Sequence, residues 1–363
     1  MSLINKTSFK HSLALPLFAL TLTLLLLGVL AVYNASVVEA YRDFGNKYHF
    51  VVQQLKWVIL GVILLLTASR LPPNFYKKIA VPFFIFSLIL MIAVLIPGIG
   101  NRLQGARRWI NVAGFTLQPS ELLKLSLIVY LAAWLESPKP LANFLFILGL
   151  VIGLTMLQPD LGTAIILATT GFLMFYISGA PLLQLSGLAL GGLVFGLIMI
   201  VSSPYRLARL STFLDPTKDP LGASYHINQV LLALGSGGIT GVGLGRSRQK
   251  HEYLPEATTD SIFAVIGEEL GFIGSITLIF LLLGLILLAF KVASRSKSRF
   301  QQLLAAGVAG WISSQFLLNI SAMVALVPLT GIPLPLISYG GSSLITTLAG
   351  IGILASVARS IKS

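Results

Sequence analysis

Ten apolar runs, each about as long as one membrane-spanning helix, recur along the whole chain. About 20 apolar residues cross a bilayer as a helix. The runs lie near residues 13–35, 50–69, 79–97, 117–135, 141–157, 161–178, 182–203, 261–290, 303–327 and 338–358. They are continuous and do not alternate with polar residues, which excludes a membrane-spanning β-barrel. The sequence therefore predicts an all-α integral membrane protein with about ten transmembrane helices, forming a single polytopic membrane domain over residues 1–363.

The composition agrees with this class and removes several kinds of chemistry. Hydrophobic residues make up 56% of the chain and charged residues only 10%, a balance outside the range of soluble globular domains. The chain contains no cysteine. Disulfides, thiolate nucleophiles and cysteine metal sites are therefore excluded.

The distribution of basic residues predicts which end of the helices faces the cytoplasm. With ten spans both termini lie on one side, and that side holds 12 of the 25 basic residues but only one acid, Glu136. Basic residues concentrate in cytoplasmic loops. We therefore expect a multi-pass protein of the cytoplasmic (inner) membrane with both termini in the cytoplasm. Because the basic residues are scattered over short loops, we expect no nucleic-acid partner.

The longest polar segment, residues 205–260, is predicted to be one large extracytoplasmic loop between the seventh and eighth helices. Its stretch "ASYHINQVLLALGSGG" has apolar residues at helical spacing and is expected to form a short amphipathic helix. Long loops in compact proteins are usually functional or disordered, and the helical spacing favours an ordered loop. The histidines His226 and His251 lack zinc-ligand spacing and are expected at the surface.

Acidic residues gather where this loop enters the eighth predicted helix. Five of the 12 acids lie there: Glu252, Glu256, Asp260, Glu268 and Glu269. Capping of the helix N-terminus would account for Glu256 or Asp260 singly. It does not account for Glu268 and Glu269, which lie two turns or more into the predicted span. Charged residues inside a span are functional candidates.

Other polar residues interrupt the apolar sequence on the same predicted side. Arg107 and Arg108 lie in "GARRWI". Glu121 and Lys124 are spaced i,i+3, which also suits a simple salt bridge. Asp160 in "QPDLGTA" can cap the following helix or belong to a site.

Two glycine-containing stretches have no regular pattern. The segment "GSGGITGVGLG" (235–245), soon followed by Lys250, suits either a tight turn or a phosphate site made of backbone N–H groups. The segment "VPLTGIPLPLISYGGSS" (327–343), which contains Ser338 and Tyr339, is expected to be a broken or re-entrant segment that lines a cavity.

Five stretches together resemble the SEDS family (shape, elongation, division and sporulation). They are "GARRWI", "QPSELLK", "QPDLGTA", "GVGLGRSRQKHEYLPEATTDSIFAVIGEELG" and "PLTGIPLPLISYGGSS", in the family's order and spacing. The "QK" before "YLPEA" and the final "YGGSS" resemble the division member FtsW or its sporulation relative more than the elongation member RodA. The family's aspartate is kept as Asp260, whereas Thr259 and Ser261 replace the usual histidine and phenylalanine.

The resemblance implies a peptidoglycan glycosyltransferase. Such an enzyme would polymerise lipid II, a disaccharide-pentapeptide on undecaprenyl pyrophosphate, with inversion at the anomeric carbon. It would act at the outer face of the cytoplasmic membrane, in cell division or in cell elongation. The resemblance also implies a class B penicillin-binding protein transpeptidase as partner, together with other divisome or elongasome proteins.

This chemistry gives roles to the polar residues. Asp260 is the candidate catalytic carboxylate, as general base for the attacking hydroxyl or, with Glu256, as ligand of Mg²⁺ or Mn²⁺. No organic cofactor is expected. The basic side chains would hold the leaving pyrophosphate. The candidate substrate-binding residues are Arg107, Arg108, Lys124, Glu121, Asp160, Glu256, Lys250, Ser338 and Tyr339.

Two other functions use the same sequence features. A lipid II flippase would need the same basic groove, but a transporter is expected to hold ionisable groups near the midplane and to show repeat symmetry. A non-enzymatic scaffold that only recruits the penicillin-binding protein would not need carboxylates inside the membrane. The acids cluster at one end of the predicted helices, which favours the enzyme.

Overall fold

Ten long helices make up most of the structure, a computed structural model that describes residues 13–103, 106–112, 115–215, 219, 222, 224–251 and 253–361. They are α1 (Ala14–Phe44), α2 (His49–Arg70), α3 (Pro73–Ala93), α4 (Pro119–Trp134), α5 (Leu141–Leu157), α6 (Leu161–Ile177), α7 (Leu182–Val201), α10 (Ile262–Arg295), α11 (Arg299–Met323) and α12 (Gly341–Ser360). Seven are long and apolar enough to cross a membrane, and α5 and α6 are shorter apolar helices. Each of the ten overlaps one predicted run, so the all-α membrane fold is confirmed.

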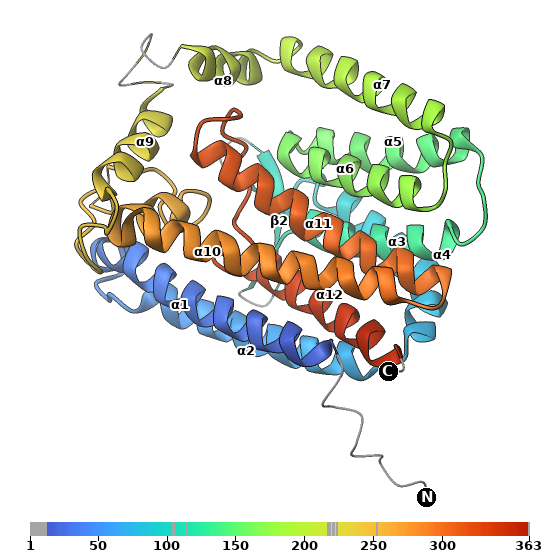
Figure 1. Cartoon of the computed structure of the whole chain (residues 1–363). Coiled ribbons are helices and arrows are strands. Elements are labelled where there is room, and N and C mark those ends of the chain that lie inside the picture. The colour runs from blue at the N-terminus through green and yellow to red at the C-terminus, as the bar shows by residue number, and fades with distance from the viewer. Residues whose placement is uncertain are drawn as a thin grey trace, which may run out of the picture.

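The helices lie side by side in one bundle (Figure 1). Helices α11 and α12 are central, because 72% and 78% of their most apolar windows are buried inside the protein. Helix α7 lies along the edge of the bundle, and only 6% of its window is buried. Its exposed leucine, valine and phenylalanine side chains suit contact with lipid chains.

Five shorter elements lie outside the ten helices. Between α3 and α4 the chain forms an antiparallel sheet of β1 (Gly100–Leu103), β2 (Ala106–Val112) and β3 (Phe115–Leu117). Between α7 and α10 lie α8 (Pro204–Leu214) and α9 (Tyr225–Gly237). Helix α9 confirms the predicted amphipathic helix, whereas the sheet and α8 were not predicted. In Figure 1, α8 and α9 lie at the end of the bundle opposite the chain's C-terminal end.

Helix α10 is broken at Gly271, whose φ of 67° lies in the left-handed region. Main-chain groups on both sides of such a break lose their helical partners. Segment 238–243 replaces these partners with four hydrogen bonds of 2.9–3.1 Å. After the break, Phe272 N and Ile273 N donate to the carbonyls of Gly238 and Ile239. Before the break, the carbonyls of Glu268 and Glu269 accept from Val242 N and Gly243 N. A Cβ at Gly271 would lie 2.3 Å from the nitrogen of Gly241, so this contact requires glycine.

The two acids inside α10 hold the turn that follows this segment. Glu268 is only 1% exposed, and its carboxylate accepts hydrogen bonds from Ser247 Oγ (2.5 Å) and from the N–H groups of residues 248–249 (2.9 and 3.3 Å). The carboxylate of Glu269 forms a buried ion pair with the ammonium group of Lys250 at 3.1 Å. Both acids therefore have partners inside the protein, and a structural role accounts for them.

Removing the Glu268 carboxylate is expected to destabilise the fold. Glu268→Ala leaves one hydroxyl and two N–H groups buried without their acceptor, and hydrogen bonds to charged groups contribute about 1.5–3 kcal/mol each. We expect the free energy of unfolding to fall by about 2–5 kcal/mol, measured on purified protein in detergent. Glu136→Ala is the control, because it removes only a surface ion pair with Lys77, worth about 0–1 kcal/mol. Equal effects of the two variants would contradict the structural role.

Candidate functional site

Asp260 lies in a short segment that is fixed by hydrogen bonds from distant parts of the chain. The carbonyls of residues 258–260 accept hydrogen bonds from Tyr339 N (2.9 Å), Ser338 Oγ (2.5 Å) and Asn319 Nδ2 (2.9 Å), in that order. Ser338 is itself fixed, because its hydroxyl accepts a hydrogen bond from Leu334 N at 2.8 Å. The main chain that carries the Asp260 carboxylate is therefore held before α10 begins.

The surroundings of the Asp260 carboxylate favour its protonated form. Burial, followed by the negative charge of Glu256, raises the pKa of Asp260 to about 6. Glu256 is held nearby, since its Oε2 accepts a hydrogen bond from Thr259 Oγ1 at 2.7 Å. The carboxylate also faces Gly331, where a Cβ would lie 3.6 Å from Asp260 Oδ2. A carboxyl group with a pKa near neutrality is suited to general-base work.

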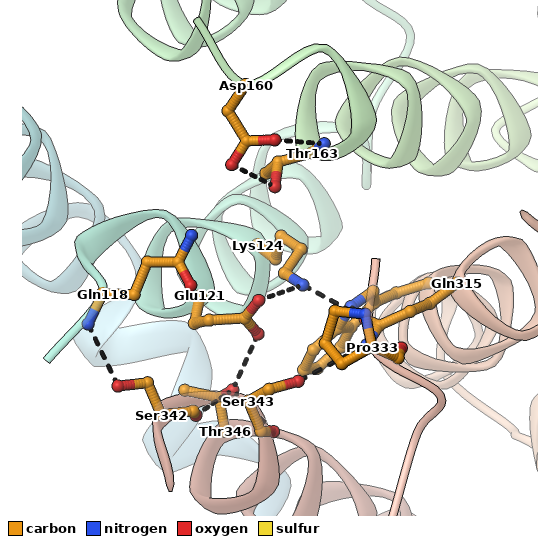
Figure 2. A network of polar contacts seen from close by, with 11 residues as sticks. Gln118, Glu121, Lys124, Asp160, Thr163, Gln315, Pro333, Ser342, Ser343 and Thr346 are labelled. Carbon is orange, nitrogen blue, oxygen red and sulfur yellow. Dashed lines mark hydrogen bonds and ion pairs between the residues drawn. The ribbon is translucent and has the colours of Figure 1, made fainter. Parts of the chain in front are cut away.

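A second polar centre lies inside the bundle where α4, α11 and α12 meet (Figure 2). The ammonium group of Lys124 is 2.8 Å from Glu121 Oε1 and 3.1 Å from Gln315 Oε1. Glu121 Oε2 accepts a weaker hydrogen bond from Thr346 Oγ1 at 3.4 Å, and Trp311 Nε1 donates to Gln315 Oε1 at 3.0 Å. Glu121 and Lys124 are 3% and 2% exposed, so the salt bridge, one of the two uses that their spacing suited, is present and buried.

Two amide side chains on α11 join this centre to the Asp260 segment. Gln315 and Asn319 are one helical turn apart and lie on the same face of α11. Gln315 Nε2 donates to the carbonyl of Pro333 at 3.0 Å, and Asn319 Nδ2 donates to that of Ile332 at 2.8 Å. Residues 324–340 are not helical, which confirms the predicted break. This non-helical segment thus touches both centres.

Arg108 and Asp160 form a third group near the start of α6. Arg108, on β2, donates from Nε and Nη2 to the carbonyls of Gln158 (2.8 Å) and Pro159 (2.5 Å). Asp160 caps α6, since its carboxylate accepts hydrogen bonds from Thr163 N (3.0 Å) and Thr163 Oγ1 (2.8 Å), as Figure 2 shows. Arg108 thereby connects the sheet to the end of α5, and Asp160 has the capping role that was one of its two expected uses.

The start of α6 also lies against the non-helical segment. A Cβ at Gly162 would be 2.8 Å from Ile332 Cγ1 and 3.0 Å from the carbonyl oxygen of Thr330. Residues 330–332 therefore lie between the start of α6 and Asp260. Two further predicted residues have partners within the protein. Arg107 donates to the carbonyl of Leu95 at 3.3 Å, and Lys250 is buried against Glu269.

Several residues of the site were missed by sequence reasoning. Arg209 on α8 donates to the carbonyl of Leu329 at 2.8 Å. His226 was expected at the surface, and this was wrong: its Nε2 lies 2.7 Å from Ser261 Oγ, and burial, with the charge of Arg209, lowers the pKa of His226 to about 4. Gln315 and Asn319 carried a usable signal, because they are amides four residues apart in an apolar run.

Among the residues described, no group of three or more histidine, aspartate or glutamate side chains could hold a metal ion. Asp260 and Glu256 are a pair of carboxylates close enough that, after burial, the charge of Glu256 also raises the pKa of Asp260. Mg²⁺ is commonly held by one or two carboxylates, with waters and substrate phosphates completing its ligands. The pair is thus too small to hold a metal ion alone but fits a cation whose other ligands come from outside the protein, and the metal stays a prediction.

Known proteins share this chain's sequence and fold over nearly its whole length. It is 40% identical to the "Probable peptidoglycan glycosyltransferase FtsW" of Coxiella burnetii, with 93% of this chain and 94% of the relative covered. It is 39% identical to the "Stage V sporulation protein E" of Bacillus subtilis, with 97% and 99% covered.

Two solved structures resemble it with 29% identity each. One, described as "Structural coordination of polymerization and crosslinking by a peptidoglycan synthase complex", has a TM-score of 0.78, with 95% of this chain and 97% of that chain covered. The rod shape determining protein RodA of Thermus thermophilus has a TM-score of 0.70, with 96% and 97% covered. The family of cell cycle proteins FtsW, RodA and SpoVE matches residues 15–363. The resemblance to SEDS proteins is thus confirmed, and the chain belongs to this family.

Proposed function

We propose that this protein is a peptidoglycan glycosyltransferase that polymerises lipid II in cell division or cell shape. The observation that carries the proposal is the Asp260 carboxylate, which has a pKa near 6 on a main chain held by three hydrogen bonds. The names of the curated relatives support the same activity. A carboxylate whose main chain is fixed in this way suits catalysis, because little reorganisation is needed at the moment of reaction.

In the proposed reaction, a sugar hydroxyl of one substrate attacks the anomeric carbon of another. The new bond forms between that oxygen and carbon, and the hydroxyl proton goes to the Asp260 carboxylate. The bond between the anomeric carbon and the pyrophosphate oxygen breaks, and the pyrophosphate leaves with the electron pair. Attack from the side opposite the leaving group inverts the anomeric centre.

The leaving pyrophosphate needs positive charge or hydrogen-bond donors. We assign this role to Arg108 and Lys124, with Arg107 as a further basic residue on β2. Lys124 acts from within its network with Glu121 and Gln315, so it also holds the non-helical segment. The other residues assigned to the substrate's surroundings are Asp160, Glu256, Ser338 and Tyr339. Lys250 stabilises the turn beside α10.

A divalent cation, Mg²⁺ or Mn²⁺, fits Asp260 and Glu256. When bound, it would supply charge that offsets the developing charge of the pyrophosphate.

The protein partner is proposed to be a class B penicillin-binding protein, within the divisome or elongasome. The solved peptidoglycan synthase complex that this chain resembles, which couples polymerization to crosslinking, supports such a partner.

The loop between α7 and α10 is proposed to lie outside the cytoplasmic membrane, with both termini in the cytoplasm. The chain has no cysteine, so single cysteines report position without background. Ser211→Cys on α8 should react with an impermeant maleimide in cells whose cytoplasmic membrane is intact. Ser137→Cys, between α4 and α5, should react only after permeabilisation. Both serines are exposed, so accessibility within the protein does not separate them. The reverse labelling pattern would place the loop and Asp260 on the cytoplasmic side of the membrane and contradict the proposed site.

Asp260→Asn is expected to reduce lipid II polymerisation by about 10²–10⁴-fold, the usual contribution of a general base. Asn keeps the shape of the side chain, and the three hydrogen bonds to the carbonyls of residues 258–260 remain, so folding should be kept. Glycan chains made by the purified protein with its partner are the measurement. Asp43→Asn is the matched control, because Asp43 is an exposed acid at the end of α1. Near wild-type polymerisation by Asp260→Asn would exclude catalysis by this carboxylate.

The same carboxylate predicts a pH dependence. A general base is active when deprotonated, so kcat/KM should fall as the pH drops through about 6, the pKa of Asp260. Glu256→Gln removes the like charge that helps raise this pKa, so the falling limb should move to lower pH. If the fall in kcat/KM occurs at the same pH in Glu256→Gln as in wild type, the titrating group is not Asp260.

Arg108→Ala should weaken substrate use, because hydrogen bonds to charged groups contribute about 1.5–3 kcal/mol, or roughly tenfold to a hundredfold in KM. Arg108→Lys should restore only part of it, since lysine lacks the planar fork of donors. Arg42→Ala, an exposed arginine near the end of α1, is the control. A KM unchanged by Arg108→Ala would remove this residue from the pyrophosphate site.

A further inference from the structure

His226 is the one described histidine whose ring is bonded directly beside Asp260. It lies in the first turn of α9, and its Nε2 is 2.7 Å from the hydroxyl oxygen of Ser261. Ser261 is fully buried and follows Asp260 in the chain. The three hydrogen bonds described above hold the carbonyls of residues 258–260, on the side before α10. The imidazole holds the next residue, at the start of α10.

The hydroxyl of Ser261 bonds His226 and does not cap α10. Ser261 is the N-cap residue of α10, a position where serine normally accepts a hydrogen bond from the first turn of the helix. Here its side chain makes no capping hydrogen bond. The bond to His226 takes its place and joins α9 to the first turn of α10.

Helices α8 and α9 approach Asp260 from two directions. On one side, Arg209 of α8 donates to the carbonyl of Leu329, two residues before the glycine that faces the Asp260 carboxylate. On the other side, His226 of α9 bonds Ser261. The charged groups that act on His226 are Arg209 and Glu256. The segment between α7 and α10 thus contacts both flanks of the candidate catalytic carboxylate.

We propose that His226 is a positioning residue, which through Ser261 fixes the direction of the Asp260 carboxylate. The expected effect on kcat rests on the proposed function, whereas the contact between His226 and Ser261 is independent of it. A neutral imidazole offers one donor and one acceptor, so either partner can donate in the bond to the hydroxyl. A glutamine at this position offers an amide with the same two capacities, whereas alanine offers neither.

The kinetic test is a double-mutant cycle in the lipid II polymerisation assay. His226→Ala and Ser261→Ala should each lower kcat about tenfold, with KM changed less than twofold. The double variant should be no slower than either single variant, because both remove the same bond. His226→Gln should keep at least half of the wild-type kcat. His251→Ala, an exposed histidine of the same segment, is the control and should leave kcat unchanged.

Hydrogen exchange of the same variants measures positioning without activity. Main-chain amides in the first turn of α10 should exchange faster in His226→Ala and Ser261→Ala than in wild type, and not in His251→Ala or His226→Gln. Any of three results would overturn the proposal. They are unchanged amide exchange in the first turn of α10, a kcat of His226→Ala within twofold of wild type, or a kcat of the double variant that falls by the product of the two single effects. Loss of the proposed function looks different, because Asp260→Asn would then polymerise normally while the exchange difference at α10 persisted.

Discussion

The interior of a membrane protein has no free water for unpaired carbonyls, yet residues 324–340 are non-helical beside the central helices. Unpaired polar groups there would cost several kcal/mol each. The structure meets this constraint with two amides on one face of α11, Gln315 and Asn319, which donate to the carbonyls of Pro333 and Ile332. With the bonds of Arg209 to Leu329 and of Ser338 to Thr259, these two hydrogen bonds fix the path of the segment.

The same two amides also determine how the polar centres relate to one another. Gln315 accepts from Lys124 while it donates to Pro333, and Asn319 donates to the carbonyl of Asp260 while it donates to Ile332. The buried ammonium group of Lys124 and the main chain that carries the Asp260 carboxylate are therefore both held by one face of α11. Preorganised polar groups in a water-poor site stabilise charge more strongly than groups in water.

Much of the fold could be predicted, because each long helix coincides with an apolar run of about the length that spans a membrane. Asp260 could be predicted from its motif and its place at the mouth of a helix. The sheet at residues 100–117 could not, since its strands are only three to seven residues long. The contact between His226 and Ser261 joins residues 35 positions apart. Such a pairing depends on how α9 packs, which local sequence does not encode.

The break at Gly271 has a mechanical consequence. Before the break, the carbonyls of Glu268 and Glu269 accept main-chain hydrogen bonds from segment 238–243, and their carboxylates hold the turn beyond it. After the break, Phe272 and Ile273 donate to the same segment. Segment 238–243 therefore bridges the break and joins the two parts of α10. A tilt of the long inner part, as bilayers of different thickness demand, would therefore also move segment 238–243 and, through it, the first turns of α10 that follow Asp260.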